Sequence, residues 1–489
     1  MIVFYILGAL AAAAIVGAFV LAMRRWPDAF PLLAIFALPF RLPISTGGRT
    51  VNLLIPLYLV IAAGTLTFLV PRWLGRGGVT APASGPGDGG GSGLGDRTGR
   101  GGDESVGDSS TSTSTSTSTS TAISSWLSPR GLEWLLLGAV VLYALQAIYS
   151  TDHGKAAENI AFFYIPFGLL FMLLRDVRWT RELILRCLAI AVALAVVFAG
   201  IGFVEYYRKS LFLNPKVIAA DQYGNYFRVN SLLFDPNIYG RFLAIVMIAV
   251  TAIVLWARNR REVLIGAGVL AWLLAGLITS FSQSSIAALL LGMTVLAAYR
   301  WDVRGTLYVA GALLAIVLVV VVAAPSSLHF GLKGSGGSTS NATSGRTKLV
   351  DGGLELFADR PLWGYGAGSF ETEYRRHGDA SAANAVSASH TIPITVAAEQ
   401  GIVGLAVYVA LLVAAFATLF RGAGRSPPRI ALAACFAALV LHTWTYADFL
   451  EDPITWTLLG IGVALARGRG RAMLAVGKGS APEQNAPSM

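Results

Sequence analysis

The sequence predicts an all-α, polytopic integral membrane protein with about 12–13 transmembrane helices and one large extracytoplasmic loop. Hydrophobic residues make up 55% of the 489 residues and charged residues only 13%, unlike the composition of a soluble domain. Apolar runs of about 20 residues recur along the chain, and this is the length at which a helix crosses the hydrocarbon core of a bilayer. Short clusters of Arg and Lys flank these runs, as they do at the cytoplasmic ends of membrane spans.

The first spans are predicted near the N-terminus. An apolar run at residues 2–23 is followed at once by Arg24 and Arg25. A signal peptide carries its positive charge before the apolar run, so we expect a retained span with its N-terminus outside. Residues 30–40 form either a short second span or a re-entrant segment, and residues 51–70 form the third span.

The composition changes abruptly at residues 71–130. This segment contains the run GPGDGGGSG and an alternation of Ser and Thr. Neither has enough apolar side chains to form a packed core. We therefore expect a disordered cytoplasmic insertion that is not needed for chemistry.

Further spans are predicted after the insertion, and together with the earlier segments they make about 13. They lie at residues 132–149, 160–174, 183–203, 238–257, 263–279, 286–298, 307–324, 402–420, 430–445 and 454–466. The predicted organisation is N-terminal membrane helices at 1–70, the insertion at 71–130, central membrane helices at 131–324, a large extracytoplasmic loop at 325–390, C-terminal membrane helices at 391–467 and a cytoplasmic tail at 468–489.

The basic clusters predict the orientation. If the spans alternate in direction, the clusters all fall on one face: Arg24 and Arg25; Arg72 and Arg76; Arg175, Arg178 and Arg181; Arg258, Arg260 and Arg261; Arg300 and Arg304; Arg421, Arg425 and Arg429; Arg467, Arg469 and Arg471. The positive-inside rule makes this face cytoplasmic. We therefore expect a multi-pass protein of the inner (cytoplasmic) membrane, with the loops at 41–50, 150–159, 205–236 and 325–390 on its outer face.

The loop at 325–390 is the longest polar interval between two strongly apolar segments. It holds a basic pair, Arg346 and Lys348, then an apolar-periodic segment, a glycine-rich run at 364–368, and His390 at the start of the next span. The glycine run lacks the Lys-Ser/Thr ending of a phosphate-binding P-loop, so we interpret it as a tight turn between two loop helices.

A second outer loop carries Arg228, followed by Asp235 and Pro236 at the start of the next span. Aspartate before proline favours a helix start, with Asp as the N-cap and Pro in the first helical position. Two further segments are polar or acidic, Ser280-Phe-Ser-Gln-Ser-Ser285 and Tyr446-Ala-Asp-Phe-Leu-Glu-Asp-Pro453.

The order of these parts resembles the core of the O-antigen ligase and O-antigen polymerase family of membrane glycosyltransferases. The resemblance rests on Ser344-Gly-Arg-Thr347, on Leu356-Phe-Ala-Asp-Arg-Pro-Leu-Trp-Gly-Tyr-Gly-Ala-Gly-Ser-Phe370, on the position of His390, and on Ala398-Glu-Gln-Gly-Ile-Val-Gly404. The Arg228 loop, the serine segment and the acidic turn also fit. The family usually has Asn after the loop histidine, where this sequence has Thr391.

The resemblance implies a GT-C-like fold and transfer of a glycan from an undecaprenyl-diphosphate donor to an acceptor hydroxyl, with inversion at the anomeric carbon. It assigns Arg346 and Arg228 to the leaving diphosphate, which suits a planar guanidinium because it binds phosphate oxygens bidentately and stays charged. Lys348 is placed in the same substrate-binding group. His390 would be the base that takes the acceptor's proton.

Several alternatives remain at this point. Ligases and polymerases share these motifs and differ in the acceptor, which is a glycan or a lipid. Some relatives are assigned to bicarbonate transport, so a membrane transporter is a second class of function, although few charges lie inside the spans. Both Cys residues lie in apolar runs, and no His, Cys or carboxylate group has metal-ligand spacing, so we expect no metal and no cofactor. No aromatic-interleaved basic patch points to nucleic acid.

Overall fold

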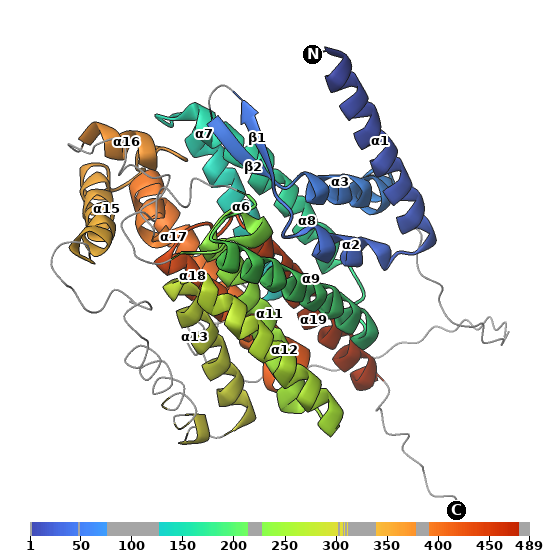
Figure 1. Cartoon of the computed structure of the whole chain (residues 1–489). Coiled ribbons are helices and arrows are strands. Elements are labelled where there is room, and N and C mark those ends of the chain that lie inside the picture. The colour runs from blue at the N-terminus through green and yellow to red at the C-terminus, as the bar shows by residue number, and fades with distance from the viewer. Residues whose placement is uncertain are drawn as a thin grey trace, which may run out of the picture.

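The computed structural model describes residues 2–46, 49–75, 127–213, 227–301, 304–306, 308, 311, 339–377 and 391–478. In this part of the chain the elements are helices, apart from one short β-hairpin (Figure 1). Nine helices among the described residues are long and apolar enough to cross a membrane. The prediction of an all-α polytopic membrane protein is confirmed.

Some of the helices that could span a membrane are single helices, and others, the compound spans, consist of consecutive helical segments joined end to end. They are α1 (Ile2–Arg25); α3 (Ile55–Gly64) with η1 (Thr65–Leu69) and α4 (Val70–Trp73); α6 (Pro129–Ala147); α7 (His153–Asn159) with η2 (Ile160–Tyr164) and α8 (Ile165–Arg175); α9 (Arg181–Arg208); α11 (Pro236–Trp256); α12 (Arg260–Thr279); α17 (Ile392–Phe420); and α18 (Pro427–Thr445).

The remaining described helices include two that cover predicted spans. They are α2 (Ala29–Ala37), α13 (Gln283–Arg300), α15 (Thr339–Asp359), α16 (Phe370–His377), α19 (Pro453–Lys478) and the short 3-10 turns η3 (Ser231–Leu233) and η4 (Ala423–Arg425). Helices α13 and α19 lie where spans were predicted at 286–298 and 454–466. The predicted span at 307–324, apart from Tyr308 and Gly311, and residues 76–126 of the predicted insertion lie outside the described residues, while the ends of that segment belong to α4 and α6.

Two of the compound spans contain the same local feature, a π-helical turn just before a proline. Turn η1 precedes Pro71 and turn η2 precedes Pro166. Proline has no N–H and its ring crowds the preceding helical turn, so the backbone must widen for the helix to continue. The π-helical turns therefore keep both helices continuous across the membrane.

The third predicted span begins later than expected. Strand β1 (Leu42–Thr46) pairs antiparallel with β2 (Arg49–Leu53), so residues 51–53 belong to a hairpin and the helix starts at Ile55. Thr50 and Val51 are β-branched residues, which favour extended backbone. Helix α2 has 9 residues, which is about 14 Å of rise against a hydrocarbon core of about 30 Å. It is too short to cross a membrane by itself.

Two other predicted boundaries were wrong. Helix α17 starts at Ile392, well before the predicted 402, because its N-terminal part packs on the outer loop. Helix α9 continues to Arg208, so Glu205 is helical and not the first residue of a loop. The Glu205 carboxylate is buried and accepts hydrogen bonds from the backbone N–H of Phe212 at 3.0 Å and of Ser231 at 2.8 Å. These bonds explain why the helix extends past the apolar run.

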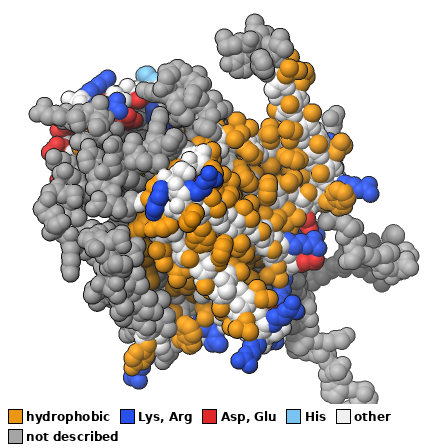
Figure 2. Space-filling view, in the orientation of Figure 1, with side chains coloured by type: hydrophobic (Ala, Val, Ile, Leu, Met, Phe, Trp, Pro, Cys, Tyr) orange, Lys and Arg blue, Asp and Glu red, His pale blue; other side chains and the backbone are white. Residues whose placement is uncertain are grey.

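Helix α11 lies at the centre of the bundle, packed against α9, α12, α13 and α18 (Figure 1). Apolar side chains cover much of the face seen in Figure 2, and Lys and Arg lie along its lower and right edges, with a few near its middle and upper left. Cys187 and Cys435 are free and buried, as the sequence predicted. This surface suits a lipid environment.

Segments predicted for the basic face are joined there by polar contacts. Arg72 pairs with Asp176 at 2.5 Å, Arg175 pairs with Glu133 at 2.9 Å, and Arg467 pairs with the same glutamate. Segments predicted for the opposite face also contact one another, as the next section describes. These contacts group the segments predicted for each face, and the orientation of the chain in the membrane stays a prediction.

Candidate functional site

The loop that the sequence predicts on the outer face, called the outer loop below, docks onto the helical bundle through the carboxylate of Glu399. This side chain accepts hydrogen bonds from the N–H of Gly368 at 2.9 Å and of Phe370 at 3.1 Å, and its backbone oxygen accepts one from the N–H of Gly366 at 2.8 Å. Glu399 is 7% exposed. One buried carboxylate thus satisfies the N–H groups of the glycine turn and of the start of α16.

Gly401 breaks α17 directly below this contact. Its φ is +64°, and a Cβ there would lie 2.4 Å from the carbonyl carbon of Leu362. The N–H of Ile402 is released from the helix and donates to the carbonyl oxygen of Pro361 at 2.7 Å. Only glycine allows the loop backbone to approach the helix this closely.

The turn between α6 and α7 holds the loop from its other side. The Ser150 hydroxyl donates to the carbonyl oxygen of Ala367 at 2.7 Å, and the Thr372 hydroxyl donates to the Asp152 carboxylate at 2.9 Å. Around the glycine turn, α15, α16 and the start of α17 form a small core of Leu349, Leu356, Tyr365, Phe370 and Ala398. The predicted turn between two loop helices is confirmed, and it is fixed on both sides.

The predicted site residues of this loop are only partly described. Arg346 and Lys348 lie on the backbone of α15, and their side chains are outside the description. His390 lies outside the described residues, as does the segment that precedes it. The convergence of Arg346, His390 and Arg228 on one substrate stays a prediction.

Arg228 is half-buried on the face where the outer loop docks. Its Nε donates to the carbonyl oxygen of Ser280 at 3.1 Å, and its Nη2 donates to Oδ1 of Asn237 at 3.2 Å. Asn237 follows Pro236 at the start of α11, where Asp235 caps the helix as predicted. The start of one helix and the end of another therefore set the direction of the guanidinium.

A chain of hydrogen bonds continues from Asn237 into the bundle. The Ser282 hydroxyl donates to Asn237 Oδ1 at 2.9 Å and lies 2.7 Å from the hydroxyl of Ser285. Ser285 and Ser284 lie 3.1 Å and 3.3 Å from Nε2 of His442, which is fully buried. No role for His442 was predicted from the sequence. Only its place in an otherwise apolar span could have drawn attention to it.

Arg241 lies in the second turn of α11 and is buried. Its Nη2 is 2.8 Å from Oδ2 of Asp452, and both residues are 1% exposed. Its Nη1 donates to the carbonyl oxygen of Ala447 at 3.3 Å. The ion pair ties α11 to the acidic turn before α19, which explains the polarity of that turn. A charged residue inside a predicted span was the available signal.

Glu451 lies in the same acidic turn. Its Oε1 accepts a hydrogen bond from Nδ2 of Asn159 at 2.9 Å, so the turn also contacts the end of α7. Loss of hydration raises the pKa of Glu451 to about 7, and the negative charge of Asp448 adds to this while the cation of Lys155 opposes it. Among the described residues, no group of three or more His, Cys, Asp or Glu is arranged to hold a metal ion.

Comparison with known proteins adds an independent observation. Residues 268–409 match the family model described as O-antigen ligase. The match begins within α12, covers α13, α15 and α16, and ends within α17. Arg346, Lys348 and His390 fall inside it, and Arg228 falls outside. No curated protein matches the chain. Residues 268–409 therefore resemble an O-antigen ligase domain and lie in a chain with several helices long and apolar enough to cross a membrane, which supports a membrane enzyme of the O-antigen ligase/polymerase type.

Proposed function

We propose that the protein transfers a glycan from an undecaprenyl-diphosphate-linked donor to an acceptor hydroxyl on the outer face of the cytoplasmic membrane. The observation that carries the proposal is the fixed guanidinium of Arg228, within hydrogen-bond reach of Asn237 and Ser280. A guanidinium that is already oriented binds a diphosphate with less loss of side-chain entropy. The family match supports the lipid-linked glycan substrate.

In the proposed reaction, the acceptor oxygen attacks the anomeric carbon from the side opposite the diphosphate. The new carbon–oxygen bond forms as the bond to the diphosphate breaks, which inverts the configuration. His390 takes the proton of the hydroxyl, and Arg228, Arg346 and Lys348 balance the charge of the departing lipid diphosphate. No step in this scheme uses a metal ion or a cofactor.

The orientation is part of the proposal and follows from the basic face. Glu355 lies exposed on α15, on the opposite side. In intact cells, a membrane-impermeant maleimide should label Glu355→Cys, whereas Glu262→Cys, near Arg260 and Arg261, should react only after the membrane is opened. The reverse pattern would contradict an outer-face site.

Transfer by the purified enzyme tests the reaction, with a lipid-diphosphate donor and a donor-binding assay on the same variants. Arg346→Lys keeps the charge but loses the bidentate geometry, so it should be nearly as damaging as Arg346→Ala. His390→Ala should abolish transfer and leave donor binding intact, because the base acts on the acceptor. Arg228→Ala should weaken donor binding.

Two neighbouring residues serve as matched controls. Arg375 is an exposed loop arginine paired with Glu371, and His377 is a second loop histidine. Arg375→Ala and His377→Ala should retain transfer. Near wild-type turnover in His390→Ala would remove the base assignment. Supplying either a glycan-lipid acceptor or a second lipid-linked repeat unit separates ligase from polymerase activity. If neither acceptor supports transfer, the proposed reaction is rejected.

A further inference from the structure

An apolar patch lies exposed on the outer loop, where the turn between α15 and α16 passes α17. Leu362 is 63% exposed and Trp363 is 57% exposed. Neighbouring large side chains from the bundle are exposed as well, with Ile148 at 75% and Ile402 at 46%. Contiguous apolar side chains on a protein surface mark a contact with another apolar phase or molecule.

The backbone that carries this patch is held in place. The carbonyl oxygen of Pro361 accepts a hydrogen bond from Ile402 N–H at 2.7 Å, and the carbonyl oxygen of Trp363 accepts one from the Tyr149 hydroxyl at 2.7 Å. The close approach at Gly401 fixes the residue between them. The exposure of Leu362 and Trp363 is therefore a property of the folded loop and not of a loose segment.

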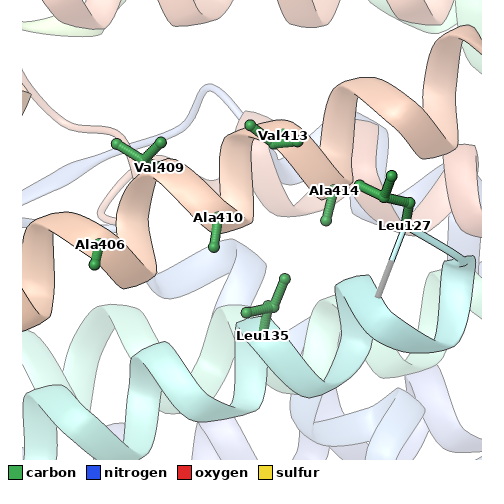
Figure 3. Close-up of a pocket in the computed structure, with 7 residues that line it drawn as sticks. All are labelled: Leu127, Leu135, Ala406, Val409, Ala410, Val413 and Ala414. Atoms are coloured by element: carbon green, nitrogen blue, oxygen red, sulfur yellow. The ribbon is translucent and has the colours of Figure 1, made fainter. Parts of the chain in front are cut away.

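The patch continues an apolar surface of the bundle. Below it, α6 and α17 run side by side and enclose a groove of about 390 Å³ (Figure 3). The residues that line it are all apolar: Leu127, Leu135, Ala406, Val409, Ala410, Val413 and Ala414. Ile148 follows the last residue of α6, and Ile402 begins the part of α17 beyond the Gly401 break. The patch thus lies at the outer end of a membrane-facing surface.

The residue types fit the boundary between lipid headgroups and acyl chains. Trp363 and Tyr149 are amphipathic aromatic residues, which concentrate at this depth. Arg360, at the start of the turn, is exposed, and its guanidinium carbon lies 4.4 Å from the centre of the Tyr365 ring. Arg360 is exposed three positions before Trp363, and an exposed cation close in sequence to an amphipathic aromatic residue is typical of a segment that lies in the interface plane.

We propose that residues 361–363, with Ile148 and Ile402, insert into the outer leaflet of the bilayer at this boundary. The sequence alone assigned the turn to the large extracytoplasmic loop. Insertion sets the height of α15 relative to the lipid headgroups. If the proposed function holds, this height brings Arg346 to the level at which the diphosphate of a lipid-linked donor lies.

Spin-label accessibility tests the insertion without any activity assay. The full-length protein carrying Leu362→Cys is labelled with a nitroxide in nanodiscs of phosphatidylethanolamine and phosphatidylglycerol; the native Cys187 and Cys435 are buried. Glu355→Cys, exposed on α15, is the matched control. Oxygen concentrates in lipid and a nickel chelate stays in water. The ratio of the label's accessibility to oxygen to its accessibility to the nickel chelate should therefore be several-fold higher at position 362 than at position 355.

Two results would overturn the proposal. A ratio at position 362 equal to that at 355 would place the turn in water. Protection of position 362 from both reagents would mean that protein covers it. Trp363→Cys carries the same label if Leu362→Cys does not fold. Because no substrate is used, these outcomes are independent of whether the proposed glycan transfer is correct.

Discussion

The side-chain oxygen of Asn237 accepts two hydrogen bonds, one from the guanidinium of Arg228 at 3.2 Å and one from the hydroxyl of Ser282 at 2.9 Å. Asn237 lies in the first turn of α11, and Ser282 is the N-cap of α13. One amide therefore connects the arginine of the outer surface to the ends of two buried helices. The direction of that guanidinium depends on a residue that would not contact the substrate in the proposed reaction.

We predict that Asn237→Ala weakens donor use without removing the charge of Arg228. A hydrogen bond to a charged group is worth about 1.5–3 kcal/mol, so KM for the donor should rise about 10-fold or more while kcat falls less. Asn259→Ala is the matched control, because Asn259 caps α12 at the opposite face, with Oδ1 2.9 Å from the N–H of Arg261. An unchanged KM in Asn237→Ala would show that Arg228 is oriented by its other contacts.

The Arg241–Asp452 pair should behave as a buried ion pair. Removing one partner leaves an uncompensated charge, so Arg241→Met or Asp452→Leu should each destabilise the protein by about 3–5 kcal/mol. The double variant should recover much of this loss, since it leaves neither charge buried. Thermal unfolding in nanodiscs measures the double-mutant cycle. Additive effects of the two substitutions would contradict a direct coupling.

Gly401→Ala should release the outer loop from α17. The new Cβ would lie 2.4 Å from the Leu362 carbonyl carbon, at a backbone φ of +64° that disfavours a side chain. Hydrogen exchange in the peptide that contains Gly366 and Gly368 should accelerate, because both amides are bonded to Glu399. The rate of glycan transfer should fall, because the loop is no longer held against the bundle.

The matched control for this experiment is Gly138→Ala. A Cβ at position 138 meets no atom within 4 Å. This variant should leave exchange in the loop peptide unchanged and keep transfer at the wild-type level. Slow exchange in Gly401→Ala would mean that the loop stays docked without the close backbone approach.

Glu451 should make stability depend on pH. Its pKa is raised to about 7 in the folded protein, above the ordinary value of about 4.3 for a glutamate in an unfolded chain. Between these values the folded state binds more protons than the unfolded state, so stability should fall as pH rises from about 5 through 7. Glu451→Gln stays neutral, and its Tm should decline less over this range.

Glu182→Gln is the control for this titration, because Glu182 is 73% exposed on the opposite face, paired with Arg186. Its Tm should follow the wild-type pH profile. Parallel profiles for Glu451→Gln and the wild type between pH 5 and 8 would exclude Glu451 as the titrating group.

The sequence determined the features that depend on composition and on neighbouring residues. The apolar runs located the spans because hydrocarbon thickness sets their length. Asp235 before Pro236 predicted the start of α11, and the glycine run predicted a turn between two helices. Each of these follows from backbone chemistry within a few residues. The resemblance to the O-antigen ligase family was also readable, since most of the motifs that carry it lie between Ser344 and Gly404, within the matched residues 268–409.

The tertiary structure decided which of the polar residues have partners. Arg241 and the carbonyl oxygen of Ala447 are 206 positions apart, and Ser285 and His442 are 157 apart. No local pattern reports such a contact, because burial and packing bring the two groups together. The same applies to Glu399 and Gly401, whose motif the sequence contained without explaining it. The carboxylate of Glu399 binds the N–H of Phe370, 29 positions earlier, and the absence of a side chain at Gly401 lets the backbone of Leu362, 39 positions earlier, approach the helix. Both features serve the docking of the loop.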